Sequence, residues 1–76
     1  MTEYIATFFS HFGATVFARM LRERGLPNRT MPVPRRISSS CGSCVRFAAA
    51  DPLALCTPEV EGIYTLAGEV LWRAEA

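Results

Sequence analysis

Hydrophobic residues are grouped along the 76-residue chain in short blocks, and the spacing inside each block predicts its structure. Residues 3–9 are rich in β-branched and aromatic side chains, which is typical of a buried strand. Between residues 11 and 24 the apolar positions recur at helical spacing and predict an amphipathic helix. The expected core stripe of this helix is Phe12, Val16, Phe17, Met20 and Leu21. Ser10 is suited to cap the helix start, and Gly25 is suited to end it in a left-handed conformation.

The same reasoning predicts four further strands, over residues 27–33, 43–48, 61–66 and 69–73. Prolines at the end of the first of these limit its length. Residues 35–40 show no periodicity, so we expect a loop there. A short helix between residues 49 and 56 is limited to about two turns by Pro52 and Pro58.

The order of these elements predicts an α+β fold of the ferredoxin-like kind. This is a split βαβ sandwich with the order βαββαβ, here with a shortened second helix and an added C-terminal strand. The right-handed crossover rule places the first helix start and the connection between strands two and three at one edge of the sheet. His11 and the segment Cys41–Cys44 are therefore expected to be neighbours. Cys56 would join them only if the second helix spanned the full height of the sheet.

Composition adds that the chain is small and rather apolar. Its length allows a single domain, residues 1–76. A core of this size typically supplies only about 3–5 kcal/mol, so a metal, a disulfide, a dimer or a larger complex is expected to add stability. Hydrophobic residues make up 50% and charged residues 20%, so part of the surface is expected to dock on another protein. Trp72, in the last strand, is a candidate anchor for such docking.

The charge pattern and the hydropathy exclude several classes of partner. The net charge is +1 and aromatic residues do not interleave with a basic stripe, so we expect no nucleic-acid binding. No apolar run approaches the roughly 18 residues that cross a membrane, so we expect no membrane insertion. The first residues lack the pattern of a signal peptide, which favours a cytoplasmic location. In that compartment the three cysteines are expected to be reduced.

The chemistry is concentrated in residues 32–44, with the sequence PVPRRISSSCGSC. A basic, proline-stiffened approach leads into a C-x-x-C pair formed by Cys41 and Cys44. Arg35, Arg36 and the positive end of the first helix are expected to favour the thiolate of Cys41. An odd number of cysteines also argues against a structural disulfide framework.

The blocks P-V-P-R and I-S-S-S-C-G resemble the signature of a small bacterial family of selenium/sulfur carrier-like proteins, whose members also occur fused to sulfurtransferase-like domains. The resemblance covers roughly residues 3–66. It implies that Cys41 holds sulfane sulfur or selenium, and that the partners are donor and acceptor proteins. Two features depart from the family pattern: the added cysteines Cys44 and Cys56, and the curtailed second helix.

Several roles stay open for the residues of this region. Cys44 could resolve a persulfide on Cys41, bind a soft metal, or simply pack in a strand. The residues that would hold the cargo are Arg35, Arg36, Ser40 and Gly42. The zinc alternative is a Cys₃His set made of Cys41, Cys44, Cys56 and His11. The thioredoxin interpretation of C-x-x-C does not fit, because that motif opens a helix and this one leads into a strand.

The leading hypothesis is a carrier or accessory protein without its own turnover, with Cys41 as the carrying atom and Cys44 assisting release. The alternative is a structural or maturation subunit of a larger redox enzyme complex, with the cysteines binding zinc or contacting an iron–sulfur cluster. A third hypothesis is a simple dithiol switch, which predicts a reversible Cys41–Cys44 disulfide.

Overall fold

The computed structural model describes residues 1–75. These residues form one helix, five strands and a single 3₁₀ turn. The elements are β1 (Thr2–Phe8), α1 (His11–Glu23), β2 (Asn28–Pro32), β3 (Ser43–Ala49), η1 (Pro52–Leu55), β4 (Val60–Thr65) and β5 (Val70–Arg73). The predicted strands and the first helix are therefore present, with bounds that differ by one or two residues. The predicted second helix is reduced to η1, because Pro52 and Pro58 leave no room for a longer one.

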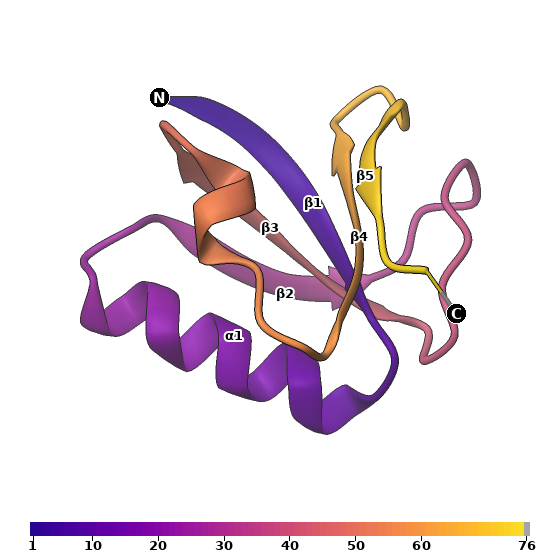
Figure 1. The fold of residues 1–76 in the computed structure, drawn as a ribbon, viewed down its shortest axis with the longest axis horizontal. Helices are drawn as coiled ribbons and strands as arrows, with labels where there is room; N and C mark the ends of the chain where they lie inside the picture. The colour runs from indigo at the N-terminus through magenta and orange to yellow at the C-terminus, as the bar shows by residue number, and fades with distance from the viewer. Residues whose placement is uncertain (76) are drawn as a thin grey trace.

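The strands form one antiparallel sheet in the order β2-β3-β1-β4-β5. The order is interleaved: β3 lies between β1 and β2, and β1 lies between β3 and β4. The molecule is thus a small α+β fold with one helix on a five-strand antiparallel sheet. Figure 1 shows α1 crossing one side of the sheet, with η1 on the same side.

Helix α1 begins and ends as its sequence predicts. The Ser10 hydroxyl accepts a hydrogen bond of 3.1 Å from the Gly13 amide, and Gly25 has a φ of 71°. The predicted core stripe is wrong at Phe12, which is 73% exposed. The helix turns a narrower face to the sheet, formed by the buried residues Gly13, Ala14, Phe17, Ala18 and Leu21. Small side chains on that face let the helix approach the strands closely.

Both faces of the sheet are covered, by different elements. The main core lies between the sheet and α1, where the Phe17 ring packs at 5.2 Å from that of Phe8 and 5.3 Å from that of Phe47. On the opposite face, the connection between β2 and β3 folds back over the sheet. Ile37 from this connection is buried in a second cluster with Ile5, Cys44 and Tyr64. We call residues 33–42 the covering loop.

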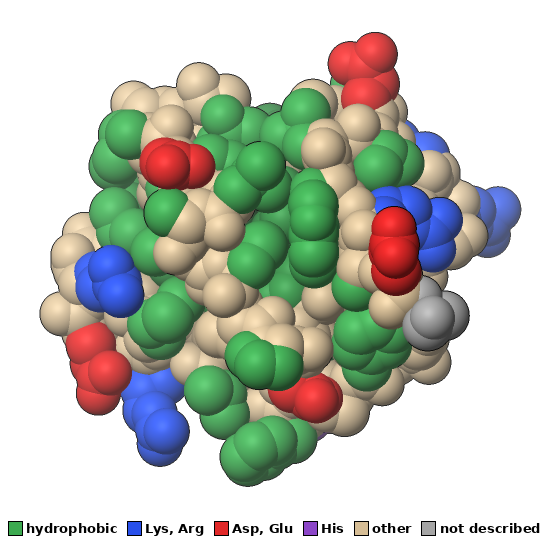
Figure 2. Space-filling view, in the orientation of Figure 1, with side chains coloured by type: hydrophobic (Ala, Val, Ile, Leu, Met, Phe, Trp, Pro, Cys, Tyr) green, Lys and Arg blue, Asp and Glu red, His purple; other side chains and the backbone are tan. Residues whose placement is uncertain are grey.

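The side of the sheet that carries α1 is covered unevenly. Helix α1 contacts β1, β2 and β3, and only the short η1 segment stands where a second helix would cover β4 and β5. Figure 2 shows hydrophobic side chains gathered on this side, between η1 and the β4–β5 hairpin. Within residues 1–75, no helix is long and apolar enough to cross a membrane.

Candidate functional site

The candidate site lies at the edge of the sheet where β1 ends and both α1 and β3 begin. His11, the first residue of α1, has its Nδ1 atom 3.4 Å from the hydroxyl of Ser43, the first residue of β3. Cys41 and Cys44 flank Ser43 in the sequence. The expected proximity of His11 to the Cys41–Cys44 segment is therefore confirmed, although about thirty residues separate them in the chain.

Cys41 is a half-buried residue at the end of the covering loop. Its thiol donates to the carbonyl of Ser43 at 3.4 Å, and its side chain packs against the edge of the main core. Gly42 then takes a φ of 76°, a conformation that glycine adopts without strain, and turns the chain into β3. The Gly42 carbonyl accepts a hydrogen bond of 3.1 Å from the Val33 amide, which closes the loop at its base.

Glu61 of β4 fixes the loop immediately before Cys41. Its carboxylate accepts two hydrogen bonds from Ser40, one from the amide at 3.0 Å and one from the hydroxyl at 2.5 Å. Ser40 therefore anchors the loop to β4 through both its polar groups. This contact also places a carboxylate one residue away from Cys41.

Arg36 fixes the middle of the covering loop. Its guanidinium donates to the Leu66 carbonyl from Nε at 3.0 Å and from Nη2 at 2.6 Å. Leu66 follows the end of β4, whereas Glu61 lies near its start, so the two anchors are roughly 15 Å apart along the strand. The Arg36 guanidinium is thus directed toward the β4–β5 turn rather than toward Cys41. Its neighbour Arg35 is exposed.

Cys44 occupies a very different environment, on the face of the sheet beneath the covering loop. Its side chain is fully buried, and its thiol donates to the Pro32 carbonyl at 3.7 Å. Burial, and to a lesser extent the charge of a Cys41 thiolate, raises the pKa of Cys44 from 9.0 to about 11. In this conformation Cys44 is a protonated, inaccessible thiol at neutral pH.

Cys56 lies away from the other two cysteines. Cys56 directly follows η1, which comes after the end of β3. At that end of β3, Ala49 pairs with Thr2, at the start of β1. Cys44, in contrast, pairs with Thr7, near the other end of β1. Cys56 is half-buried against the main core, and burial raises its pKa.

The structure does not assemble the predicted Cys₃His metal set. Among residues 1–75, no group of three or more His, Cys, Asp or Glu side chains is arranged to hold a metal ion. The four residues of that set were Cys41, Cys44, Cys56 and His11. Because η1 is too short to bring Cys56 across the sheet, the set lacks the geometry that zinc requires.

Two acidic residues support the site and were not predicted from the sequence. Glu61 holds Ser40, and Glu59 accepts a hydrogen bond of 2.7 Å from the Ser10 hydroxyl at the start of α1. The side chain of Glu59 also lies so close to Gly13 that an added Cβ there would be 2.5 Å from the Glu59 Cβ. These partners are 21 and 49 residues apart in the chain, so no local pattern indicates them.

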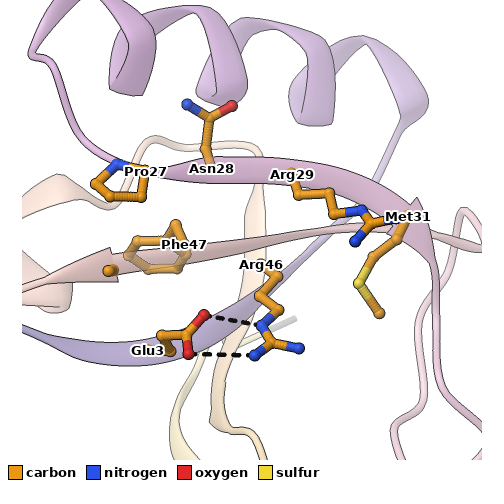
Figure 3. A pocket seen from close by; sticks show the side chains of 8 residues that line it. Glu3, Pro27, Asn28, Arg29, Met31, Arg46 and Phe47 are labelled. Carbon is orange, nitrogen blue, oxygen red and sulfur yellow. Dashed lines mark hydrogen bonds and ion pairs between the residues drawn. The ribbon is translucent and has the colours of Figure 1, made fainter.

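A pocket lies elsewhere, beside the β2 edge of the sheet. It has a volume of about 350 Å³ and is lined by residues of β1, β2 and β3, among them Glu3, Arg29, Met31 and Arg46. Figure 3 shows the Glu3 carboxylate bound by the Arg46 guanidinium at 2.9 and 3.1 Å, which lowers the pKa of Glu3. None of the three cysteines lines this pocket.

Comparison with models of protein families matches residues 3–57 to the family described as "Putative Se/S carrier protein-like". The chain belongs to this family. The resemblance found in the sequence is therefore confirmed, and the matched region of the Se/S carrier-like family includes all three cysteines. It ends before β4, so the β4–β5 hairpin lies beyond it. Searches of curated proteins and of solved structures gave no match.

Proposed function

We propose that this protein carries sulfane sulfur or selenium on Cys41 and transfers it between partner proteins in the cytoplasm. The observation that carries the proposal is the placement of Cys41. It is a partly exposed thiol on a loop at a sheet edge, in a chain of the Se/S carrier-like family. A carrying cysteine must be reached by a donor thiol and by an acceptor thiol, and a loop at an edge allows both.

The loading step is an exchange between a persulfide and a thiolate. The Cys41 thiolate attacks the terminal sulfur of a donor persulfide, the new bond forms on that sulfur, and the donor leaves as a thiolate. Delivery is the same reaction in reverse order, with an acceptor thiolate attacking the terminal sulfur on Cys41. A perselenide would be handled in the same way. No oxidant or reductant is consumed in either step.

The surroundings of Cys41 suit this chemistry in two respects. The start of α1 lies at the same edge, and the positive end of a helix dipole attracts an anionic cargo. The His11 imidazole lies 3.4 Å from the Ser43 hydroxyl, and the Ser43 carbonyl accepts the Cys41 thiol, so Ser43 connects the imidazole to the carrying residue. Ser40 and Gly42 set the position of Cys41 through their backbone and anchoring contacts. Arg35 is the exposed cation available to an anionic cargo.

Cys44 takes part, in this proposal, only when the covering loop opens. An exposed Cys44 thiolate would attack the Sγ atom of a persulfide-bearing Cys41, expel hydrosulfide, and form the Cys41–Cys44 disulfide. In the closed arrangement the burial of Cys44 prevents this reaction and so protects the cargo. The covering loop would then decide between transfer and release.

We also propose that the fold is a ferredoxin-like arrangement reduced to one helix. The interleaved order β2-β3-β1-β4 supports this description, because α1 connects two parallel strands with β3 between them. The fifth strand and the missing second helix are the departures from it.

The test is anaerobic loading followed by intact-mass measurement. Wild-type protein is incubated with the persulfide of glutathione, freed of small molecules, and weighed with and without reductant. We expect a gain of one sulfur atom that reductant removes, retained in Cys56→Ser and lost in Cys41→Ser. A Cys41→Ser protein that still gained the sulfur atom would end the proposal. Circular dichroism of both variants establishes that each is folded.

A further inference from the structure

The two edges of the sheet differ in how well they are protected against pairing with another strand. The β2 edge carries Arg29 and ends at Pro32, and both charge and proline discourage strand addition. The β5 edge carries no proline, its charged residue Arg73 stands at its last position, and its irregularity is a register shift in the pairing with β4. Its Val70 and Leu71 side chains are 53% and 46% exposed. An exposed apolar edge strand is a ready template for a further strand.

The charges at the two ends of β5 indicate what that further strand is. Glu69 precedes β5 and Arg73 ends it, and both are exposed. The ion pair of residues 1–75 is Arg46 with Glu3, so these two charges are not paired within the described chain. An antiparallel neighbour of the same sequence brings each Glu69 alongside Arg73 of the other copy. A parallel neighbour would instead align like charges, which is unfavourable.

We propose that β5 pairs antiparallel with β5 of a second copy of this chain, forming a two-fold symmetric dimer with one continuous sheet. The pattern E-V-L-W-R is self-complementary in charge, which favours a second copy over an unrelated strand. Pairing also brings together the two hairpins that no helix covers, each bearing Trp72 packed on its core. A chain with so small a core gains stability from such an association.

The proposed contact uses β5 of both copies, which limits the association to two copies. The pairing of β4 with β5 shifts register at Ile63 and Tyr64, and such a bulge twists the edge and shortens the segment that a neighbour can follow. A two-fold contact uses the same surface on both copies and so closes on itself. The remaining edges of the dimer are the two β2 strands, which carry the protecting residues.

The proposal is tested by exchanging the charges of Glu69 and Arg73. Dimerisation of each variant is measured by sedimentation equilibrium, with reductant present, over a range of protein concentrations. We expect wild-type protein to dimerise, and Glu69→Arg and Arg73→Glu each to raise the dimer dissociation constant roughly tenfold by replacing attraction with repulsion. The double variant restores both pairs in exchanged form and is expected to dimerise like wild type. A one-to-one mixture of the single variants is expected to form a heterodimer.

Glu75→Arg is the matched control, since it changes the charge equally and lies outside β5. Its dissociation constant is expected to stay at the wild-type value. A monomeric wild-type chain at every concentration overturns the proposal. So does a double variant as weak as the single ones, which would show that any dimer uses another surface. The measurement involves no cargo, so its outcome is independent of the carrier function.

Discussion

The two cysteines of the C-x-x-C pair lie only three positions apart and yet face opposite environments. Cys41 is half-exposed at the loop end, whereas Cys44 points into the cluster beneath the covering loop. Cys41 lies in the loop before the turn at Gly42, whereas Cys44 is the second residue of β3, with its side chain on the face that the loop covers. The pair therefore does not act as a ready dithiol in the closed structure.

The raised pKa of Cys44 predicts a loss of stability at alkaline pH. An unfolded chain releases the Cys44 proton near pH 9 and the folded chain only near pH 11, so the folded state binds the proton more tightly between these values. The contribution of the Cys44 thiol to the free energy of unfolding is therefore fully present below pH 9. It is lost as the pH rises toward 11, a fall on the order of 2 kcal/mol. Urea unfolding across this range measures it.

Cys44→Ala serves as the control for this pH dependence. The variant is expected to be less stable throughout, because a buried sulfur is removed, but to lose the steeper decline between pH 9 and 11. An identical decline in both proteins would mean that other groups cause it.

The residue roles could be predicted only in part from the sequence. Cys41 was identified because its family signature and its flanking small residues are contiguous in the chain. The roles of Glu61 and Glu59 could not be predicted, because nothing in the local sequence around either carboxylate indicates the distant serine that it binds. Arg36 was expected beside Cys41, but it reaches a carbonyl at the far end of β4.

At the scale of elements, the covering loop is the part of the fold whose position matters most for the site. Ile37 seals the cluster that contains Cys44, and Arg36 and Ser40 pin the loop to β4 and to the turn after it. These anchors are exposed, so each contributes little to global stability. Opening of the loop is therefore expected to cost much less than unfolding of the sheet.

Arg36→Met is predicted to expose Cys44 by weakening one anchor. Loss of the two hydrogen bonds to Leu66 should raise the rate of Cys44 alkylation roughly fivefold at neutral pH. Iodoacetamide labelling followed by peptide mass mapping measures each cysteine separately. Arg35→Met is the matched control, because the neighbouring side chain is exposed and is expected to leave the rate unchanged. Equal rates in both variants would contradict the anchoring role of Arg36.

Element types could be predicted well, because β-branched blocks, helical spacing and prolines are local signals. The prediction of the buried face of the helix was less accurate. Phe12 lies at helical spacing from the core positions and yet is exposed, because the face that contacts the sheet includes the small residues of α1. The path of the covering loop was not predicted. A loop without periodicity gives no sign that one of its residues, here Ile37, is buried.

At the scale of the whole molecule, β1 is the strand on which all other parts converge. It pairs with β3 on one side and β4 on the other, and it is covered by α1 on one face and by the loop on the other. The α+β class and the neighbourhood of His11 and Ser43 followed from the order of elements. The two-sided covering of the sheet did not, because it depends on contacts between distant segments.

This arrangement predicts a gradient of amide protection in hydrogen exchange. Central amides of β1, such as those of Ala6, are expected to exchange only on global unfolding. The amide of Ile37, bonded to Pro34 within the loop, is expected to exchange by local opening and much faster. Exchange measured by NMR at increasing urea separates the two, because only global unfolding depends steeply on denaturant. Equal protection at both positions would mean that the loop opens only when the sheet unfolds.

The hydrogen bond from Val33 to Gly42 has a consequence for how the loop can change over time. Because this bond joins the two ends of the loop, residues 34–41 form a loop that is closed at its base. The length of this loop does not affect the register of β2 against β3. Lengthening such a loop costs little conformational entropy. Insertions here would therefore alter the reach of the carrying thiol while the scaffold stayed the same. The covering loop is thus the segment in which we expect descendants of this chain to diversify, and the natural place to graft a different recognition sequence.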